Sequence, residues 1–251
     1  MSPSHELSDS ALERTPATGT PRGTVVVLGG RGESAEVYTR FADRIAVDGY
    51  RVVALPDVSA TESSFIAVAR RVFDENTAGP RLLVASDAAV AHGLRAVTEG
   101  DLVVDGVVVA GTLTLTGTVE LSSADDEIAE RTSCPVHRVR LAGEGVLAAG
   151  ALTRSTPRDE VDGELAARIP VPVLALHGDH DGISRLEPAI DVLGGIRDAR
   201  IFVLEGGKHD VLNDVTHRSV AAEIVQFLER LRTPEQGLKR VLLVDSSLAL
   251  G

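Results

Sequence analysis

The sequence predicts an α/β fold with a mostly parallel central sheet and helices on both faces. After residue 22, short runs rich in Val, Leu and Ile alternate with longer segments of helical spacing. The connections between them are mostly short, and such alternation is typical of strand–helix–strand units whose strands lie parallel in one sheet. The first of these runs, 24–28, is continuously apolar from Val25 onward, as expected for a strand that is buried on both faces.

The strands and helices follow in order along the chain. The predicted strands are 24–28, 51–55, 82–86, 103–110, 171–176 and 201–204. The predicted helices are 35–48, 62–73, 88–97, 186–193 and 215–231. In the first helix, Val37, Phe41 and Ile45 recur at helical spacing, and Gly49 follows as a C-terminal glycine.

One domain accounts for most of the 251 residues. Residues 1–21, rich in Ser, Thr and Pro, are expected to be disordered or loosely ordered, and 22–232 to form a single domain. The stretch 112–170 lacks a clean period, so we expect a small, partly helical, cap-like insertion over the strand ends. The C-terminal tail, 233–251, carries an apolar patch at 241–244 that either docks on the domain or pairs as an edge strand.

Charge and composition exclude several classes of protein. A formal net charge of −12 repels phosphate backbones, so we expect no nucleic-acid partner. The chain has no apolar run long enough for a transmembrane segment, and residues 1–20 lack the apolar core of a secretory signal. The one cysteine, Cys134, cannot form a disulfide within the chain, which favours a reducing, cytoplasmic location. The oligomeric state stays open.

Chemically distinctive residues follow several predicted strands. Ligands of parallel α/β sheets bind beyond the carboxyl ends of the strands. Gly29, Asp87, Asp181 and His209 each come just after a predicted strand. We therefore expect the functional site to form where these residues meet.

Asp87 occupies the junction between a predicted strand and a predicted helix. Ala85 and Ala89 lie two residues to either side, and a sharp strand-to-helix turn needs such small residues. The junction resembles the G-x-S-x-G elbow of α/β-hydrolases, with alanines in place of both glycines and Asp87 in place of the nucleophilic serine. Alternatively, Asp87 only caps the helix.

Two later segments resemble the same family. PVLALHGDHD, at 172–181, resembles the family segment PVLxxxGxxD, whose final aspartate orients the catalytic histidine, and this match falls on Asp181. FVLEGGKHDVLN, at 202–213, resembles the histidine loop of monoacylglycerol lipases and lysophospholipases and places His209 at the general-base position. An ordinary turn after a strand is the alternative for Asp181.

The segments appear in the order nucleophile, acid, base, which is the order of the α/β-hydrolase superfamily. The opening segment, 24–57, resembles the family's first core strand, oxyanion loop and following helix, and the whole resemblance covers about 22–111 and 170–232. It implies catalytic roles for Asp87, Asp181 and His209. By the same resemblance, the oxyanion and substrate-binding positions fall on Arg31, Ala88 and Gly30, with backbone N–H groups of Arg31 and Ala88 forming the oxyanion hole.

An aspartate at the elbow leaves the chemistry open. A carboxylate can attack carbon and form an ester that a histidine-activated water releases, as in haloalkane dehalogenases and epoxide hydrolases of this superfamily. The resemblance to either subclass is incomplete, because the chain has no tryptophan to hold a halide and its tyrosines, Tyr38 and Tyr50, lie outside 112–170. Ser86 lies one residue too early and is expected to point away from His209.

No cofactor or metal is expected. Gly29-Gly30-Arg31-Gly32 lacks the ending of a phosphate-binding loop, and its pattern is incomplete for dinucleotide binding. The cluster at 177–181 lacks convincing metal spacing, and Cys134 is interpreted as a small buried side chain.

The sequence thus favours a cofactor-free hydrolase that acts on a small, mainly apolar ester or similar molecule through an Asp-His-Asp triad, in which Asp87 is either a nucleophile or a base. The alternative is a catalytically degenerate or non-hydrolytic protein of the same fold, which binds a ligand, serves as a scaffold, or acts as a cyclase or isomerase.

Overall fold

The computed structural model describes residues 10–59, 62–75, 78–114, 121–154 and 156–233. Its centre is a seven-stranded sheet in the order β1-β3-β2-β4-β5-β6-β7. β1 runs antiparallel to β3, and the other neighbouring strands are parallel, which confirms the predicted class of fold. The strands are β1 (Leu12–Arg14), β2 (Thr24–Gly29), β3 (Arg51–Asp57), β4 (Arg81–Ser86), β5 (Gly106–Ala110), β6 (Val173–Gly178) and β7 (Ala199–Leu204).

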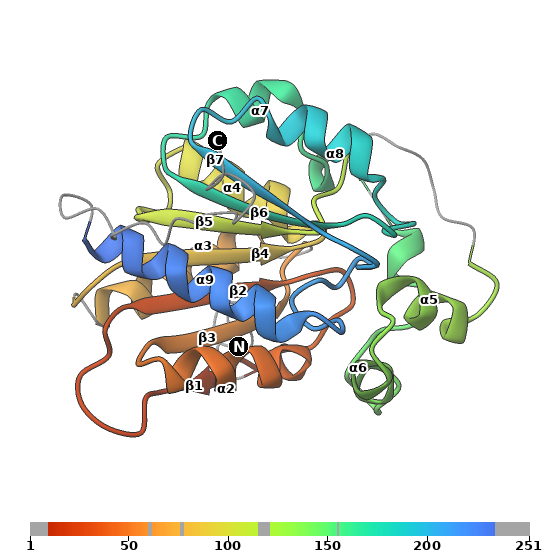
Figure 1. Ribbon diagram of the computed structural model, residues 1–251, viewed down its shortest axis with the longest axis horizontal. Helices are drawn as coiled ribbons and strands as arrows, with labels where there is room; N and C mark the ends of the chain where they lie inside the picture. The colour runs from red at the N-terminus through yellow and green to blue at the C-terminus, as the bar shows by residue number, and fades with distance from the viewer. Residues whose placement is uncertain (1–9, 60–61, 76–77, 115–120, 155, 234–251) are drawn as a thin grey trace, which may run out of the picture.

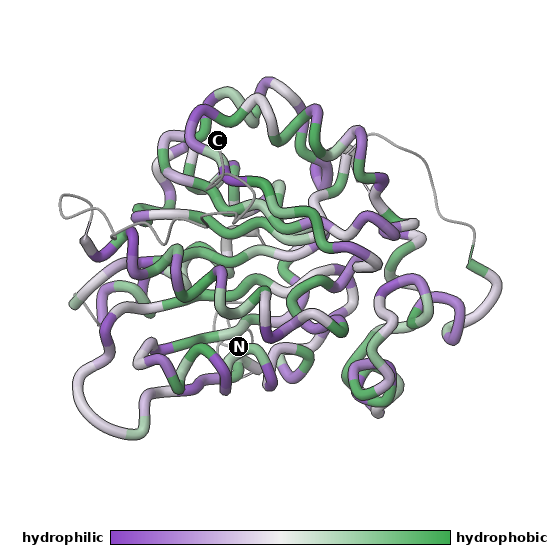
Figure 2. The backbone as a smooth tube through the Cα atoms, viewed as in Figure 1, coloured by the Kyte–Doolittle hydropathy of each residue, from purple (hydrophilic) through white to green (hydrophobic). Residues whose placement is uncertain are grey.

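Helices cover both faces of the sheet (Figure 1). The helices packed on the sheet are α2 (Thr39–Val47) and α9 (His217–Arg232) on one face, and α3 (Glu62–Glu75), α4 (Ala89–Thr98) and α8 (Leu186–Leu193) on the other. Alternate residues of β2 serve the two faces: Val25 and Val27 join the core under α2 and α9, whereas Val26 and Leu28 join the core under α3 and α4. The strands therefore appear as continuous hydrophobic stretches between more polar helices (Figure 2).

The insertion after β5 is partly helical, as expected. Its described elements are α5 (Ala124–Arg131), α6 (Pro135–Leu141), the 3-10 turns η2 (Ala151–Thr153) and η3 (Pro157–Asp159), and α7 (Gly163–Ala167). Figure 1 shows α5 and α6 beside the carboxyl ends of the strands. The insertion thus reaches the edge of the sheet where the candidate residues lie.

Most element boundaries differ from the predicted ones by one or two residues, and three differences are larger. The predicted helix 35–48 is a 3-10 turn, η1 (Ala35–Tyr38), followed by α2. The predicted strand 103–110 begins at Gly106, and Val103 is 72% exposed, so this apolar residue does not enter the sheet. Leu12–Arg14, within the segment expected to be disordered or loosely ordered, pairs with β3 as an edge strand, where Glu13 forms an ion pair with Arg51 at 2.7 Å. The apolar patch 241–244 lies outside the described residues.

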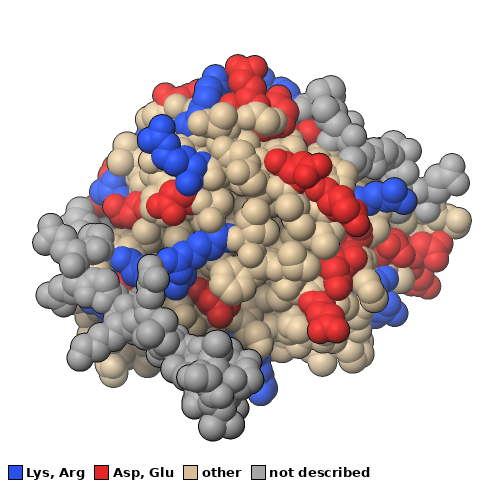
Figure 3. Space-filling model, turned by 45° about the horizontal axis from the view of Figure 1, so that its top comes forward, with Lys and Arg blue, Asp and Glu red and all other residues tan. Residues whose placement is uncertain are grey.

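On the surface, charges of both signs are interspersed. The face drawn in Figure 3 carries Asp and Glu along one side and Lys and Arg along the other, around an area of other residues. Among the described residues, no helix combines the length and the apolar character that crossing a membrane requires.

Candidate active site

The turn between β4 and α4 holds Asp87 in an unusual backbone conformation. Its φ is +55°, and among the described residues it is the one non-glycine residue with a positive φ. Such a conformation costs free energy and is found mostly where the surrounding structure enforces it, often at functional sites. Ala85 and Ala89 are buried on either side of the turn, as the small residues of a sharp elbow should be.

Of the three residues predicted as a triad, His209 lies within hydrogen-bonding distance of both carboxylates. His209 Nε2 lies 3.1 Å from Asp87 Oδ1, and His209 Nδ1 lies 2.8 Å from Asp181 Oδ2. The other oxygen of Asp181 accepts the backbone N–H groups of Ile183 and Ser184 at 2.9 and 2.8 Å. These two backbone hydrogen bonds hold the Asp181 carboxylate in place, so that it can orient the imidazole, as the acid of a catalytic triad does.

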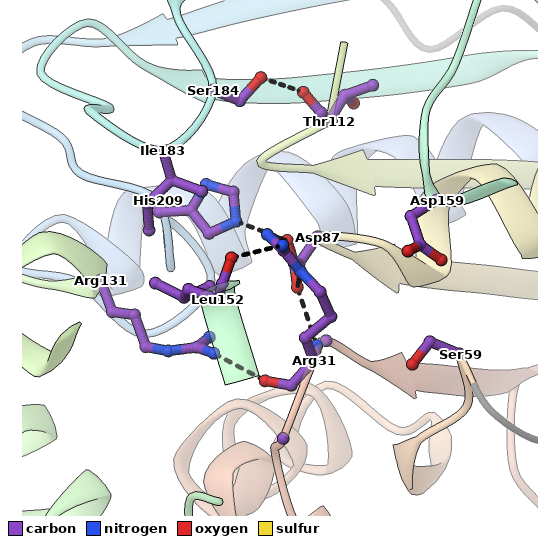
Figure 4. Close-up of polar contacts among 12 residues, drawn as sticks. Arg31, Ser59, Asp87, Thr112, Arg131, Leu152, Asp159, Ile183, Ser184 and His209 are labelled. Carbon is purple, nitrogen blue, oxygen red and sulfur yellow. Dashed lines mark hydrogen bonds and ion pairs between the residues drawn. The ribbon is translucent and has the colours of Figure 1, made fainter. Parts of the chain in front are cut away.

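A fourth residue, Arg31, enters the site with its side chain (Figure 4). Its Nε and backbone N–H both donate to Asp87 Oδ2 at 2.8 Å, and its Nη2 donates to Asp87 Oδ1 at 2.7 Å. Its Nη1 donates to the carbonyl of Leu152 at 3.0 Å. The two-pronged pair between a guanidinium and a carboxylate is the strong form of this ion pair.

All hydrogen-bond acceptor positions of the Asp87 carboxylate are consequently occupied. Each of its carboxylate oxygens lies within hydrogen-bonding distance of two nitrogens, three from Arg31 and one from His209. A carboxylate offers about four acceptor positions, so none stays free. The residue is also 0% exposed. In this arrangement the carboxylate can bind and orient its neighbours, but it cannot attack a substrate until Arg31 moves.

Charges alternate through the site in the order Arg31, Asp87, His209 and Asp181. Burial alone would raise the pKa of Asp87, but Arg31 and the hydrogen bond from His209 outweigh burial and hold this pKa well below its usual value. Burial alone would lower the pKa of His209, but the carboxylates of Asp181 and Asp87 outweigh it and raise this pKa to about 10. His209 is therefore an imidazolium at neutral pH.

A second buried network connects the insertion with the loop 30–34, which follows β2 and is called the Arg31 loop. Arg131, at the end of α5, is 0% exposed. It donates to the carbonyl of Arg31 at 2.6 Å and to Glu33 at 3.2 Å, and it lies 3.4 Å from Glu127 and 3.6 Å from Asp210. Arg131 thus connects the insertion with the Arg31 loop and with the residue after His209.

The loop itself is held from inside by Glu33. This carboxylate accepts the N–H of Gly30 at 2.9 Å and the hydroxyl of Tyr38. Burial and the charge of Asp210 raise the pKa of Glu33 to about 7, in spite of the nearby guanidinium of Arg131. Gly30 must be a glycine here, because a Cβ atom would lie 2.8 Å from the Cβ of Asp87.

Arg31 separates two environments. On the His209 side, the apolar side chains of Leu113, Leu152 and Ile183 pack together with Ala88. On the opposite side is a cavity of about 400 Å³ at the surface. The residues that line it include Arg31, Asp57, Ser59, Arg154, Thr156 and Asp159.

The sequence placed the triad residues but missed two side chains. Arg31 was expected to contribute only its backbone N–H, which here donates to Asp87, and Arg131 was not singled out. The position of Arg31 between two glycines was the one feature of the sequence that could have pointed to its side chain. No feature of the insertion, which lacks a clean period, could have pointed to Arg131.

Other candidates lie elsewhere. Ser86 lies against the hydroxyl of Tyr38, and Cys134 is a buried free cysteine beyond the triad. Within the described part of the chain, no group of three or more His, Cys, Asp or Glu residues is arranged to hold a metal ion.

The sequence matches no protein-family model and no curated protein. Solved structures, however, match most of its length and show that the chain has the α/β-hydrolase fold. One of them is the monoacylglycerol lipase of Paleococcus ferrophilus, which is 18% identical, with a TM-score of 0.69 over 88% of this chain and 98% of the lipase.

Two further structures show the same likeness. A soluble variant of monoglyceride lipase from Saccharomyces cerevisiae is 13% identical, with a TM-score of 0.72 over 89% of this chain and 92% of its own. A carboxyl esterase from Bacillus coagulans is 14% identical, with a TM-score of 0.62 over 88% of this chain and 93% of its own. At these identities the likeness establishes the fold, and the activity must be argued from the site.

Proposed function

We propose that this chain is a cofactor-free hydrolase in which Asp87 is the nucleophile, His209 the acid and base, and Asp181 the residue that orients His209. The observation that carries the proposal is the geometry of His209, whose two ring nitrogens lie 3.1 and 2.8 Å from the two carboxylates. This contact forms at the strand ends, on a strained elbow, where α/β folds place their ligands.

The charges suggest an order of steps. Arg31 first leaves Asp87, which frees a carboxylate oxygen to attack an electrophilic carbon of the substrate. A carbon–oxygen bond to Asp87 forms, the bond to the leaving group breaks, and the imidazolium of His209 protonates the leaving group. The backbone N–H of Arg31, which already donates to Asp87 Oδ2, and that of Ala88 stabilise the negative charge that develops on this oxygen when water later attacks Asp87.

Formation of the covalent intermediate also prepares the second half of the reaction; the intermediate is an ester of Asp87 when an alkyl carbon is attacked, as in an epoxide, and an anhydride when the acyl carbon of an ester is attacked. Asp87 loses its negative charge, which is one of the causes of the raised pKa of His209. The neutral imidazole then removes a proton from water, and the water oxygen attacks the carbonyl carbon of Asp87 in this intermediate. Cleavage releases the product with a proton and restores the carboxylate and the imidazolium. The apolar cluster beside Asp87 suits a substrate with an apolar part, such as a small ester.

A histidine variant tests this mechanism. Wild type and His209→Gln are incubated with a panel of short-chain 4-nitrophenyl esters and simple epoxides, and intact-protein mass spectrometry follows the chain. We expect wild type to turn over at least one compound and His209→Gln to accumulate a covalent adduct on Asp87. Full activity of Asp87→Asn, with the asparagine verified by mass, would contradict the nucleophilic role.

A second candidate is a ligand-binding protein without hydrolytic activity. It is favoured by the saturated, fully buried carboxylate of Asp87, which resembles a structural ion pair as much as a nucleophile. If it is correct, no compound of the panel is turned over and no adduct forms in either protein. The cytoplasmic location stays an expectation based on the single free cysteine.

A further inference from the structure

The cavity beside Arg31 is lined by charges of both signs. Arg31 and Asp159 are each 4% exposed, and Figure 4 shows Asp159 and Ser59 on the side of Arg31 away from His209. Arg154 is exposed at the rim, and the described residues offer it no ion-pair partner within 4 Å. At about 400 Å³, the cavity falls within the range of small-molecule sites.

The two carboxylates of the cavity are fixed in place and have acceptor capacity left. Asp57 accepts the N–H of Gly32 at 2.7 Å and both the N–H and the hydroxyl of Ser59, at 2.9 and 2.6 Å, which leaves about one of its four acceptor positions. Asp159 accepts the N–H of Thr156 at 2.6 Å and lies 2.9 Å from His92 Nε2. Burial alone would raise the pKa of Asp159, but the hydrogen bond with His92 outweighs it and lowers this pKa, so the carboxylate is ionised.

The arginines have donors left. A guanidinium has five N–H donors, and Arg31 uses Nε, one donor of Nη2 and one of Nη1 within the protein. The remaining two have no partner among the described residues, and Arg31 lines the cavity. Arg154 adds a second, solvent-facing guanidinium, and paired guanidinium groups are well suited to a planar carboxylate.

The balance of charge decides which ligand fits. The two arginines and two aspartates that line the cavity cancel formally. A purely anionic ligand is attracted by the two arginines but repelled by Asp57 and Asp159. A purely cationic ligand is attracted by the two aspartates but repelled by the arginines. A ligand that carries both charges gains from both pairs and adds no net charge.

We propose that this cavity binds a small zwitterion with a carboxylate and an ammonium group, such as an amino acid or short peptide. The carboxylate contacts Arg154 and the free donors of Arg31, and the ammonium group contacts Asp57 or Asp159. The proposal thereby gives the ligand class of the proposed active site. It rests on the proposed function in one respect, because the part of the ligand that extends past Arg31 would carry the reactive carbon to Asp87.

Binding is tested with three probes that share one side chain and differ in charge. Amide shifts of the ¹⁵N-labelled protein are followed by NMR during titration with L-leucine (zwitterion), L-leucinamide (cation) and N-acetyl-L-leucine (anion) at neutral pH. We expect L-leucine to bind about tenfold more tightly than either derivative and to shift the amides of Gly32, Ser59 and Thr156. Equal affinity for all three probes, or no shift of these amides at millimolar concentrations, would overturn the proposal.

A rim variant identifies the site. Arg154→Gln removes an exposed charge, so the protein should remain folded, and we expect its affinity for L-leucine to fall about tenfold. Arg168→Gln, an exposed arginine outside the cavity, is the matched control and should bind as wild type does. Unchanged affinity in Arg154→Gln would overturn the proposed site. If L-leucine binds as expected and no ester or epoxide is turned over, the hydrolase proposal fails and the ligand class stands.

Discussion

At the scale of single residues, the site is a chain of opposite charges inside the protein. Removing charges from water is costly, and a buried pair is tolerated only when its geometry is good and its remaining donors and acceptors are satisfied. Arg31, Asp87, His209 and Asp181 meet this condition together, since each is hydrogen-bonded to the next. The same condition explains why the site is closed: the donors that stabilise Asp87 also occupy the positions that a substrate would need.

The raised pKa of His209 makes stability depend on pH. The pKa is about 10 in the folded protein and 6.5 as the ordinary value, so the stabilising effect of the imidazolium is complete below pH 6.5 and is lost as pH rises towards 10. We expect the difference in the free energy of unfolding between wild type and His209→Gln to be largest below pH 6.5 and to shrink towards pH 10. Urea unfolding at several pH values measures it, with the exposed His180→Gln as control. A difference that grows with pH would show that His209 is neutral in the folded protein.

At the scale of elements, α5 ties two segments of the site together. Arg131 holds the carbonyl of Arg31 at 2.6 Å. One turn earlier on the same helix, Glu127 accepts the N–H groups of Gly150 at 2.6 Å and Leu152 at 3.2 Å. The carbonyl of Leu152 in turn accepts a hydrogen bond from Arg31 Nη1. A movement of α5 would therefore weaken both the support of Leu152 and the contact of Arg131 with the carbonyl of Arg31.

Loss of Arg131 should therefore destabilise the protein. Arg131→Met removes the cation from a fully buried cluster that includes Glu33 and Asp210, and unpaired buried carboxylates cost on the order of 3–5 kcal/mol. The free energy of unfolding in urea measures this loss. Arg140→Met, on exposed α6, should change it by no more than about 0.5 kcal/mol. A loss in Arg131→Met as small as in this control would mean that the cluster does not hold the insertion in place.

At the scale of the whole molecule, the site depends on two loops that cross at the ends of neighbouring strands. Gly178 ends β6, three residues before Asp181, and Gly207 follows β7, two residues before His209. His180 N–H donates to the carbonyl of Gly207 at 2.9 Å. This contact between the two loops brings Asp181 and His209 together.

A side chain at this crossing should be incompatible with the observed backbone. A Cβ atom on Gly178 would lie 2.1 Å from the carbonyl oxygen of Gly207. We expect Gly178→Ala to cost about 1–3 kcal/mol or more, with a lower Tm in thermal unfolding. Gly163→Ala is the control, because no atom lies within 4 Å of its added Cβ and alanine favours the helix α7. If Gly178→Ala melted with wild type, the two loops would have to be further apart than described.

The sequence by itself determined the fold class and predicted that Asp87, Asp181 and His209 would meet at the strand ends. Runs that are apolar on both faces and alternate with helical segments are typical of buried strands in a parallel sheet, and parallel strands bring their carboxyl ends to one edge. Asp87, Asp181 and His209 follow such strands, so their approach was a consequence of topology. The edge strand at Leu12–Arg14 escaped prediction because three residues carry too little periodicity to register.

Only the tertiary structure decided what surrounds these residues. Whether the side chain of Arg31 turns to solvent or to Asp87 depends on Leu152 and Arg131, which belong to an insertion distant in sequence and without a clean period. Electrostatic contacts between residues distant in sequence leave no local sequence pattern, because the role of a charged side chain depends on its partners and its burial in the folded protein. The closed state of the site and the mixed charge of the cavity beside it follow from those partners, and no periodicity in the chain encodes them.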